Sequence, residues 1–174
     1  MQYNVAQLLK ESIGASRIHD VDDDVSSLEG ATKWAKGQVR LLRTDKGIWV
    51  SADLVCDIPS TCSRCLSNFD FALHITIEEE YLPTIDVNTG ERIVYGNSEE
   101  DPFFIDSQHI LDLREALRQY EVASMPIKPL CREDCAGLCP MCGTDLNEGR
   151  CECTSEILDP RWETLLKLKV GGSR

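Results

Sequence analysis

The sequence predicts an α+β protein in which an antiparallel β-sheet, covered by a helix, precedes a cysteine-rich C-terminal lobe with a terminal helix. Several segments alternate apolar and polar residues as half-buried strands do, and a later segment repeats apolar residues at helical spacing. Six of the nine cysteines lie between residues 131 and 153, where large apolar side chains are sparse. Because this segment cannot fold by burial alone, it needs cross-links.

The predicted strands lie between residues 38 and 80. Segment 38–44 alternates, residues 45–47 offer a tight turn, and segment 47–56 places its apolar residues on one face, so the two segments form a hairpin. Residues 69–80 alternate most regularly and keep one polar face, which indicates a sheet covered on one side only. The acidic run at residues 20–24 is expected to be a solvated loop or a sheet edge.

The helix that covers the sheet is predicted to start after a cap at Asp106 or Ser107 and to run through Ser124. The Met125-Pro126 dipeptide ends it, because the residue before a proline is driven out of the helical conformation. Its apolar stripe repeats at helical spacing and consists of Ile110, Leu113, Leu117 and Tyr120.

Three other segments have predicted secondary structure but contain no candidate site residue. Residues 3–12 are predicted to form a short helix or a docking segment, with Gly14 as a stop signal. Residues 83–108 form a long acidic loop with one short strand near residues 93–95, and they suggest no chemistry. Residues 159–169 start with an Asp-Pro helix signal and form the terminal helix, which is expected to pack on the core.

Length and charge divide the chain into two parts. The 174 residues suffice for one ordinary core plus a small metal-stabilised satellite, so we predict a sheet-and-helix domain at residues 1–127 and a lobe at residues 128–174. Of the net charge of −12, residues 1–127 carry −11, from eleven Lys or Arg against twenty-two Asp or Glu. Such a surface repels nucleic-acid backbones and favours a basic protein partner, although acidity that serves solubility alone is the competing explanation.

The cellular compartment bears on the role of the cysteines. The N-terminus lacks the pattern of a signal peptide, and no stretch approaches the roughly 18 apolar residues of a membrane span. A cytoplasmic protein without membrane contact is therefore expected. Because thiols stay reduced in that compartment and nine is an odd number, clustered cysteines are better explained as metal ligands than as disulfides.

Spacing divides eight cysteines into two sets of four zinc ligands. Four thiolates around zinc bring the sulfur atoms to roughly 3.8 Å from one another, which a Cys-x-x-Cys turn achieves easily. Each set couples one such turn with a second pair: Cys62, Cys65, Cys131 and Cys135 form the first, and Cys139, Cys142, Cys151 and Cys153 form the second. If both Cys151 and Cys153 bind one metal, the backbone there must curl. With no open coordination position, both zinc ions would be structural.

Three alternatives to this arrangement stay open. One site built from Cys131, Cys135, Cys139 and Cys142 would leave Cys62 and Cys65 free. An iron–sulfur cluster uses the same ligands, and a redox role would need a strand-to-helix context that neither Cys-x-x-Cys pair has. Cys56 is left over in every case and is expected to be a buried thiol.

No catalytic arrangement emerges from the sequence. The three histidines, His19, His74 and His109, lie in unrelated contexts, and there is no phosphate-binding or dinucleotide-binding glycine loop. The chain is therefore not expected to be an enzyme.

Three motifs in this order give the chain a family resemblance: a Cys-x-Arg-Cys-Leu turn after a strand, then PIKPLCREDCAGLCPMCGTDLNEGRCEC, then DPRWETLLKL. The chain resembles the YceD-like family of large ribosomal RNA subunit accumulation proteins. The resemblance implies a bacterial or organellar protein that is needed for large-subunit rRNA to accumulate and has no established catalytic activity. It also implies a shared turn at Cys62 and Cys65, a ligand-like pair at Cys131 and Cys135, and an accessory segment at 139–153 that shorter members lack.

The expected function is therefore that of a non-enzymatic ribosome-biogenesis factor that supports accumulation of 23S rRNA. Its acidic surface would contact a basic large-subunit ribosomal protein or a pre-ribosomal particle, so that any link to rRNA is indirect. The alternative is a zinc-ribbon RNA-binding protein whose C-terminal lobe contacts rRNA directly through a basic patch of Lys128, Arg132, Arg150, Arg161, Lys167 and Lys169. A thiol oxidoreductase is a weaker third possibility.

Overall fold

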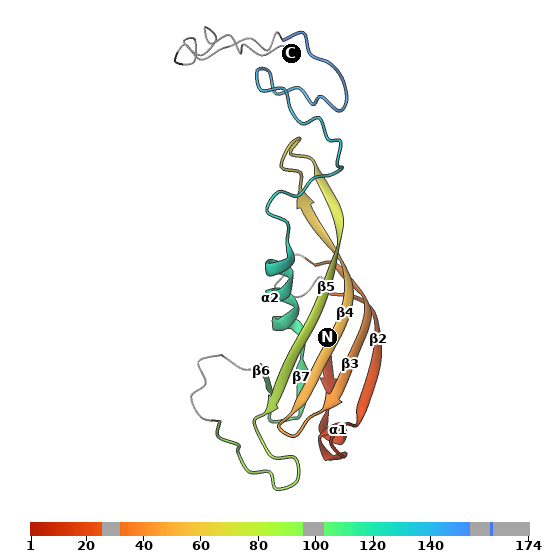
Figure 1. Ribbon diagram of the computed structural model, residues 1–174, viewed down its shortest axis with the longest axis vertical. Helices are drawn as coiled ribbons and strands as arrows, with labels where there is room; N and C mark the ends of the chain where they lie inside the picture. Colours follow the sequence, from red (N-terminus) through yellow and green to blue (C-terminus); the bar gives the residue numbers. More distant parts are fainter. Residues whose placement is uncertain (26–31, 96–102, 154–160, 162–174) are drawn as a thin grey trace, which may run out of the picture. The chain divides into compact units, whose positions relative to one another are not determined.

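The computed structural model describes residues 1–25, 32–95, 103–153 and 161 (Figure 1). Its largest feature is a five-stranded sheet in the order β2-β3-β4-β5-β6. The first four strands are antiparallel, and β6 joins β5 in parallel. The strands are β2 (Ser16–Asp24), β3 (Trp34–Arg43), β4 (Ile48–Thr61), β5 (Asn68–Pro83) and β6 (Phe103–Ile105).

The alternation of β4 and β5 determines which face of the sheet is buried. Every residue of β4 pairs with one of β5, and pairs such as Ala52↔Ile77 and Leu54↔Ile75 are buried together. Burial of each large aliphatic side chain contributes about 1.5–3 kcal/mol, so a slip of one residue would expose the whole set. The predicted hairpin at residues 38–56 and the predicted strand at 69–80 are both confirmed.

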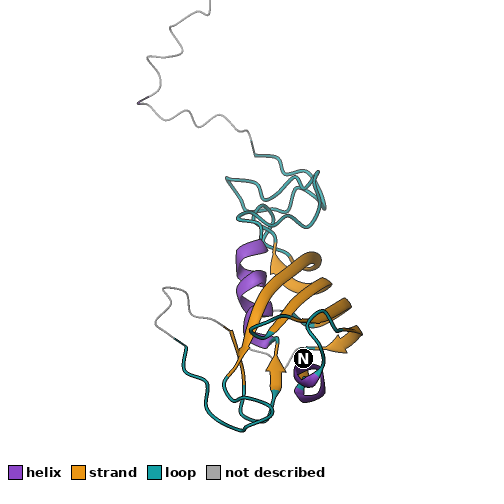
Figure 2. Ribbon diagram, turned by 60° about the horizontal axis from the view of Figure 1, so that its bottom comes forward, coloured by secondary structure: helices purple, strands orange, loops and turns teal. Residues whose placement is uncertain are grey.

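Two helices and a small second sheet cover the buried face of the large sheet. Helix α1 (Ala6–Lys10) buries Leu8 and Leu9, and helix α2 (Arg114–Ser124) buries Ala116 and Leu117. Strand β1 (Gln2–Asn4) pairs with β7 (Ile110–Asp112). All of these elements contribute to one hydrophobic cluster with the large sheet, and Figure 2 shows α2 running along the sheet.

The predicted start of the covering helix is wrong by about two turns. Asp106 accepts hydrogen bonds from the backbone of Gln108 and Ile110 in a loop, and residues 110–112 form β7. The pairing of β7 with β1 satisfies backbone groups that a helix would otherwise use, so α2 begins only at Arg114. Its end at Ser124, just before Met125, agrees with the prediction.

The edges of the large sheet differ from what the sequence suggested. The acidic run 20–24 lies in the edge strand β2, so the edge alternative is the correct one. In the segment 83–108, the short strand is β6 at residues 103–105, not at 93–95. Because β6 runs parallel to β5, the sheet is mixed at this edge.

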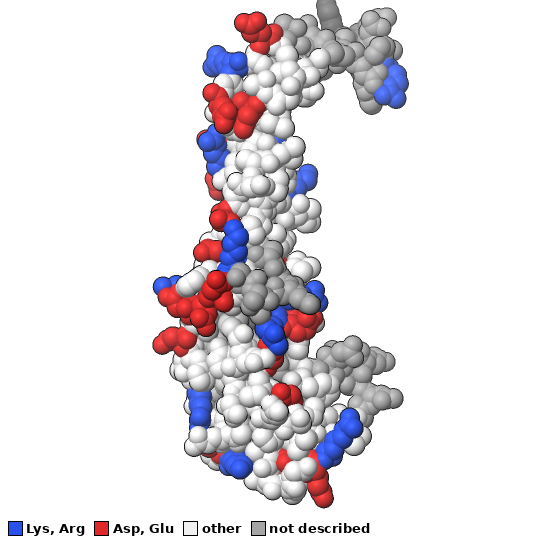
Figure 3. Space-filling model, turned by 180° about the vertical axis from the view of Figure 1, so that it is seen from behind, with Lys and Arg blue, Asp and Glu red and all other residues white. Residues whose placement is uncertain are grey.

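The second face of the large sheet points away from the hydrophobic cluster, and we call it the open face. It consists of the outward residues of β2 to β5, which neighbour one another in the strand register, for example Gln38, Asp53 and Thr76. Figure 3, a view from behind, shows acidic side chains gathered along one edge of the molecule, with Lys and Arg side chains among them. The acidic members of the open face are Asp20, Asp22, Asp24, Asp53, Asp57, Asp70, Glu78 and Glu80.

The chain divides into two compact units, one of residues 1–63 with 67–131 and one of residues 64–66 with 132–174. The expected terminal helix at 159–169 lies outside the described residues apart from Arg161, and the domain boundary between residues 127 and 128 stays a prediction. In the described part of the chain, no helix combines the length and the apolar character needed to cross a membrane.

At Gly37 the large sheet has no room for a side chain. Its φ is +155°, and a Cβ at this position would lie 2.0 Å from the backbone oxygen of Asp53 on β4. We predict that Gly37→Ala lowers the free energy of unfolding by roughly 2–3 kcal/mol, since β3 and β4 would have to separate. Urea unfolding followed by far-ultraviolet circular dichroism measures this loss.

Gly14→Ala is the matched control for this prediction. Gly14 also has a positive φ, +92°, but nothing lies within 4 Å of the position of its missing Cβ. Only the backbone strain of about 1 kcal/mol is expected there. Equal losses for the two variants would show that the close approach to Asp53 is unimportant.

Candidate metal centres

The structure brings eight of the nine cysteines together in two groups of four. Within each group the sulfur atoms all lie within 4.8 Å of one another. The first group is Cys62, Cys65, Cys131 and Cys135, and the second is Cys139, Cys142, Cys151 and Cys153. These are the two sets that spacing suggested, and the rival set that mixes Cys131 and Cys135 with Cys139 and Cys142 is not the one assembled.

The first pair of the first group lies at the tip of the β4–β5 hairpin. The backbone N–H of Cys62 donates to the carbonyl of Ser67 at 2.9 Å, which closes the turn around Cys65. Leu66 adopts a φ of +60°, a left-handed conformation that lets the chain reverse within a few residues. Both cysteines are buried. The long ladder of the hairpin therefore presents two sulfur atoms at a defined place.

Hydrogen bonds around the turn, from backbone groups and from the side chain of Arg64, hold the second pair. The N–H of Ser63 donates to the carbonyl of Pro129 at 2.8 Å, two residues before Cys131. The guanidinium of Arg64 donates to the carbonyl of Cys135 at 2.9 Å, and the carbonyl of Arg64 accepts from the N–H of Leu138 at 3.2 Å. These bonds account for the approach of segments that lie more than sixty residues apart in the sequence.

The side chain of Asn147 makes several hydrogen bonds next to the first group. Its carbonyl oxygen accepts from the guanidinium of Arg132 at 2.7 Å and from the N–H of Ala136 at 2.8 Å. Its amide nitrogen donates to the sulfur of Cys135 at 3.5 Å and to Asp145 at 2.6 Å. A donor aimed at a ligand sulfur orients that sulfur and stabilises its negative charge.

The second group is built on a tight turn. The N–H of Gly143 donates to the carbonyl of Cys139 at 2.9 Å, and Gly143 has a φ of +74°, a left-handed conformation natural to glycine. The N–H of Met141 points at the sulfur of Cys139 at 3.4 Å, as in metal-binding knuckles. Cys139 is buried, whereas Cys142 and Cys153 are exposed. The second group is therefore the more accessible of the two.

Hydrogen bonds in the second group prepare two thiols for ionisation. Hydrogen bonds with Thr144, first its hydroxyl and then its backbone N–H, lower the pKa of Cys142 to about 6. The N–H groups of Cys142 and Met141 lower the pKa of Cys139. The pKa of Cys153 rises to about 12, chiefly because its thiol donates to Cys142. Because metals bind thiolates, this network favours the form of Cys139 and Cys142 that a cation needs.

Both groups fit a tetrahedral metal ion. Four sulfur atoms within 4.8 Å of one another approach the roughly 3.8 Å separation of a tetrahedral tetrathiolate site. Each group supplies four ligands, so a bound metal would have a complete coordination shell and a structural role. Among the described residues, both groups consist of cysteine alone, and His19, His74 and His109 belong to neither.

Cys56 lies apart from both groups, as the sequence predicts. It is fully buried on β4. Burial, followed by the charges of Glu121 and Asp57, raises its pKa to about 11. The thiol is therefore protonated and packs as a small apolar side chain.

Arg64 and Asn147 are the supporting residues that sequence reasoning missed. Both lie close to clustered cysteines in the sequence, Arg64 between Cys62 and Cys65 and Asn147 between Cys142 and Cys151. The sequence shows only that each is a polar residue close to a cysteine. Their partners cannot be read from the sequence, because Arg64 donates to the carbonyl of Cys135 and Asn147 donates to its sulfur.

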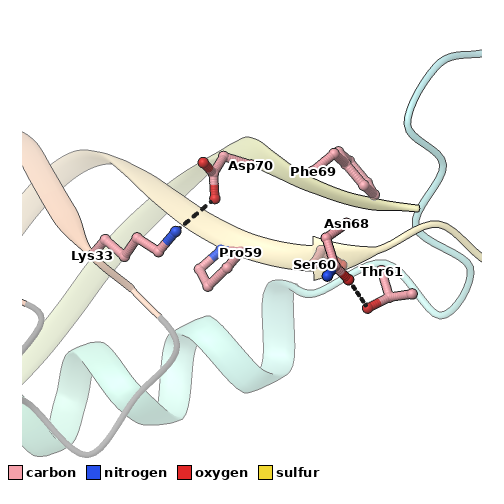
Figure 4. Close-up of a pocket in the computed structure, with 7 residues that line it drawn as sticks. All are labelled: Lys33, Pro59, Ser60, Thr61, Asn68, Phe69 and Asp70. Carbon is pink, nitrogen blue, oxygen red and sulfur yellow. Dashed lines mark hydrogen bonds and ion pairs between the residues drawn. The ribbon is translucent and has the colours of Figure 1, made fainter. Parts of the chain in front are cut away.

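A hollow of about 470 Å³ lies beside the outer end of the β4–β5 hairpin (Figure 4). Lys33 pairs there with Asp70 at 3.0 Å, and the hydroxyl of Thr61 donates to Asn68 at 3.0 Å. These polar side chains satisfy one another, and the residues that line the hollow include no nucleophile beside a base. The hollow therefore gives no support to catalysis.

We predict that the two groups bind metal independently. Cys65→Ser should remove one metal ion, Cys142→Ser the other, and Cys65→Ser with Cys142→Ser both, because each group loses a ligand that nothing replaces. Native mass spectrometry on protein purified without chelator measures the metal content. Cys56→Ala is the matched control and should retain both ions; a total of one ion in the wild type would contradict the two-site arrangement.

We also predict that Asn147→Ala weakens metal binding in the first group about tenfold, because Cys135 loses its hydrogen-bond donor. Competition with a chromophoric chelator measures the affinity. Asn88→Ala is the control, since Asn88 lies in the loop between β5 and β6 and away from both groups. An unchanged affinity in Asn147→Ala would limit Asn147 to a role in loop structure.

The chain matches a known family model and several uncharacterized mycobacterial proteins. The family model of the large ribosomal RNA subunit accumulation protein YceD matches residues 50–169, which include both cysteine groups. Uncharacterized proteins of Mycobacterium tuberculosis and Mycobacterium bovis are each 28% identical over 130 residues, 75% of this chain and 59% of theirs. An uncharacterized protein of Mycobacterium leprae is 24% identical over 129 residues, 73% of this chain and 55% of its own length.

The chain thus spans less than two thirds of the length of these curated relatives. No solved structure matches it. The family match covers more than half of the chain and contains the hairpin tip and both clusters, which are the features that the structure singles out. The chain belongs to the YceD family of large ribosomal RNA subunit accumulation proteins.

Proposed function

We propose that this protein is a non-enzymatic ribosome-biogenesis factor of the bacterial cytoplasm that supports accumulation of 23S rRNA. The observation that carries the proposal is the family match over residues 50–169. The two tetrathiolate groups support a structural part for metal, and we propose that each holds one Zn²⁺. A complete thiolate shell stabilises a small lobe without offering a coordination position for catalysis.

The proposed mode of action is contact with a basic protein partner. The net charge of −12 disfavours direct binding to a phosphate backbone and favours positively charged protein surfaces. Many large-subunit ribosomal proteins must be basic to bind rRNA, so an acidic factor can bind them, or a pre-ribosomal particle that displays them, before rRNA does. Any effect on rRNA would then be indirect.

Direct RNA binding by the C-terminal lobe is the alternative. It depends on a patch of basic residues, of which Arg132 is already engaged with Asn147 at 2.7 Å and with Asp134 at 3.4 Å. Such engagement leaves less of its charge for a phosphate group. Gel shifts with fragments of large-subunit rRNA distinguish the two modes, and a shift that persists at physiological salt would favour the alternative.

We predict that deletion of the gene lowers the ratio of 23S to 16S rRNA, and that the wild-type gene restores it. Electrophoresis of total RNA measures the ratio. A variant with Cys65→Ser and Cys142→Ser should restore it only in part, because both proposed zinc sites lose a ligand. The Cys56→Ala variant controls for loss of a thiol, and an unchanged ratio in the deletion strain would refute the proposed function.

A further inference from the structure

The open face of the large sheet is an unusual combination of charge and aromatic surface. Eight carboxylates and two cationic side chains, Lys36 and Arg40, project from it, which gives a formal charge of −6. Trp34 and Trp49 also project from it and are 42% and 37% exposed. Acidity that served solubility alone would not require two exposed tryptophans, which are more typical of protein interfaces.

The charge of this face is poorly balanced within the protein. Lys36 pairs with Asp22 and Lys33 pairs with Asp70, each at 3.0 Å, so two of the eight carboxylates are already compensated. Asp22 also accepts from the indole of Trp34 at 2.8 Å. Asp20, Asp22 and Asp24 are successive outward residues of β2, and Glu78 and Glu80 are successive outward residues of β5. Such residues lie about 7 Å apart along a strand, within the Debye length of about 8 Å at physiological salt. Like charges within each of these two runs repel one another, and a cationic partner would relieve this repulsion.

A hollow of about 240 Å³ lies within the open face and can receive a side chain. Ile18, Gln38, Arg40, Ser51 and Asp53 line it. Ile18 is 53% exposed and offers apolar surface to the methylene groups of a long side chain, and Asp53 offers a carboxylate to its head. Arg40 also lines the hollow and repels a cation, so a cationic side chain is expected to enter on the side of Asp53.

We propose that the open face is a docking surface for a Lys- and Arg-rich protein segment. Its cations pair with the carboxylates of β2, β4 and β5, and its apolar side chains cover Trp34 and Trp49. The inference rests on the proposed function for the class of the partner and deepens it by naming the surface. A nucleic acid is excluded as occupant by the sign of the charge, and a second copy of this chain would bring like charges together.

The test compares two charge reversals of equal size. Asp57→Lys with Glu78→Lys changes the open face, and Asp45→Lys with Glu91→Lys changes exposed acidic residues outside it. The probe is the basic protein fraction extracted from purified, nuclease-treated large ribosomal subunits; each retained protein is then purified and titrated. Circular dichroism verifies that both variants keep the sheet.

We predict that reversal on the open face weakens binding of the retained protein at least tenfold, whereas the control reversal changes it less than twofold. Trp49→Ala should weaken it as well, because apolar contact is lost, with no change in its dependence on salt. Equal losses in the two reversals would show that only net charge matters, and an undiminished affinity in the open-face variant would place the contact elsewhere. Either result would overturn the proposed surface.

Measurement of the ratio of 23S to 16S rRNA shows whether the docking surface or the proposed function has failed. If deletion lowers the ratio and the open-face variant restores it with undiminished binding, the docking surface is refuted and the function stands. If binding follows the open face but deletion leaves the ratio unchanged, the docking surface stands and the function is refuted.

Discussion

The pairing of β4 with β5 is the constraint on which the rest of the described structure depends. Every residue of β4 is paired, so the alternation of side chains along the hairpin is held in one register from the turn at Gly47 to the tip at Cys62. One set of side chains, which includes Leu54 and Ile75, enters the hydrophobic cluster. The other set must face outwards, and a single register therefore assigns the core, the open face and the position of two clustered cysteines.

The protein uses two different means of stabilisation. In the sheet, buried apolar side chains from β2 to β7, α1 and α2 form one cluster. The segment from Cys131 to Cys153 has few such side chains, and tight turns, the hydrogen bonds of Asn147 and the two cysteine groups take their place. Because a tetrathiolate site gains its binding free energy only when its ligands are assembled, metal binding and folding of this segment are expected to be one process.

Some elements of secondary structure could be predicted from the sequence, and others could not. The strands at residues 38–56 and 69–80 were predictable because their alternation has a period of two, and the turn at Asp45–Gly47 joins adjacent segments. The start of α2 was not predictable, because residues 110–112 have an apolar pattern that suits either a helix or a strand. Their pairing with residues 2–4, more than a hundred positions away, decides in favour of a strand.

For the candidate metal centres, too, the sequence predicted the local features and missed the long-range contacts. Ligand type, the Cys-x-x-Cys spacing and the odd number of cysteines were enough to suggest two sets of four and to set Cys56 aside, because a short turn determines the distance between sulfur atoms by itself. The support from Arg64 and Asn147 depends on contacts between distant segments, as does the assembly of the open face from four strands. The sequence by itself determined the spacing within each cysteine pair and the faces of individual strands, because these follow from local spacing and periodicity. Only the tertiary structure decided which strands lie side by side and which polar groups meet, because those choices depend on long-range pairing.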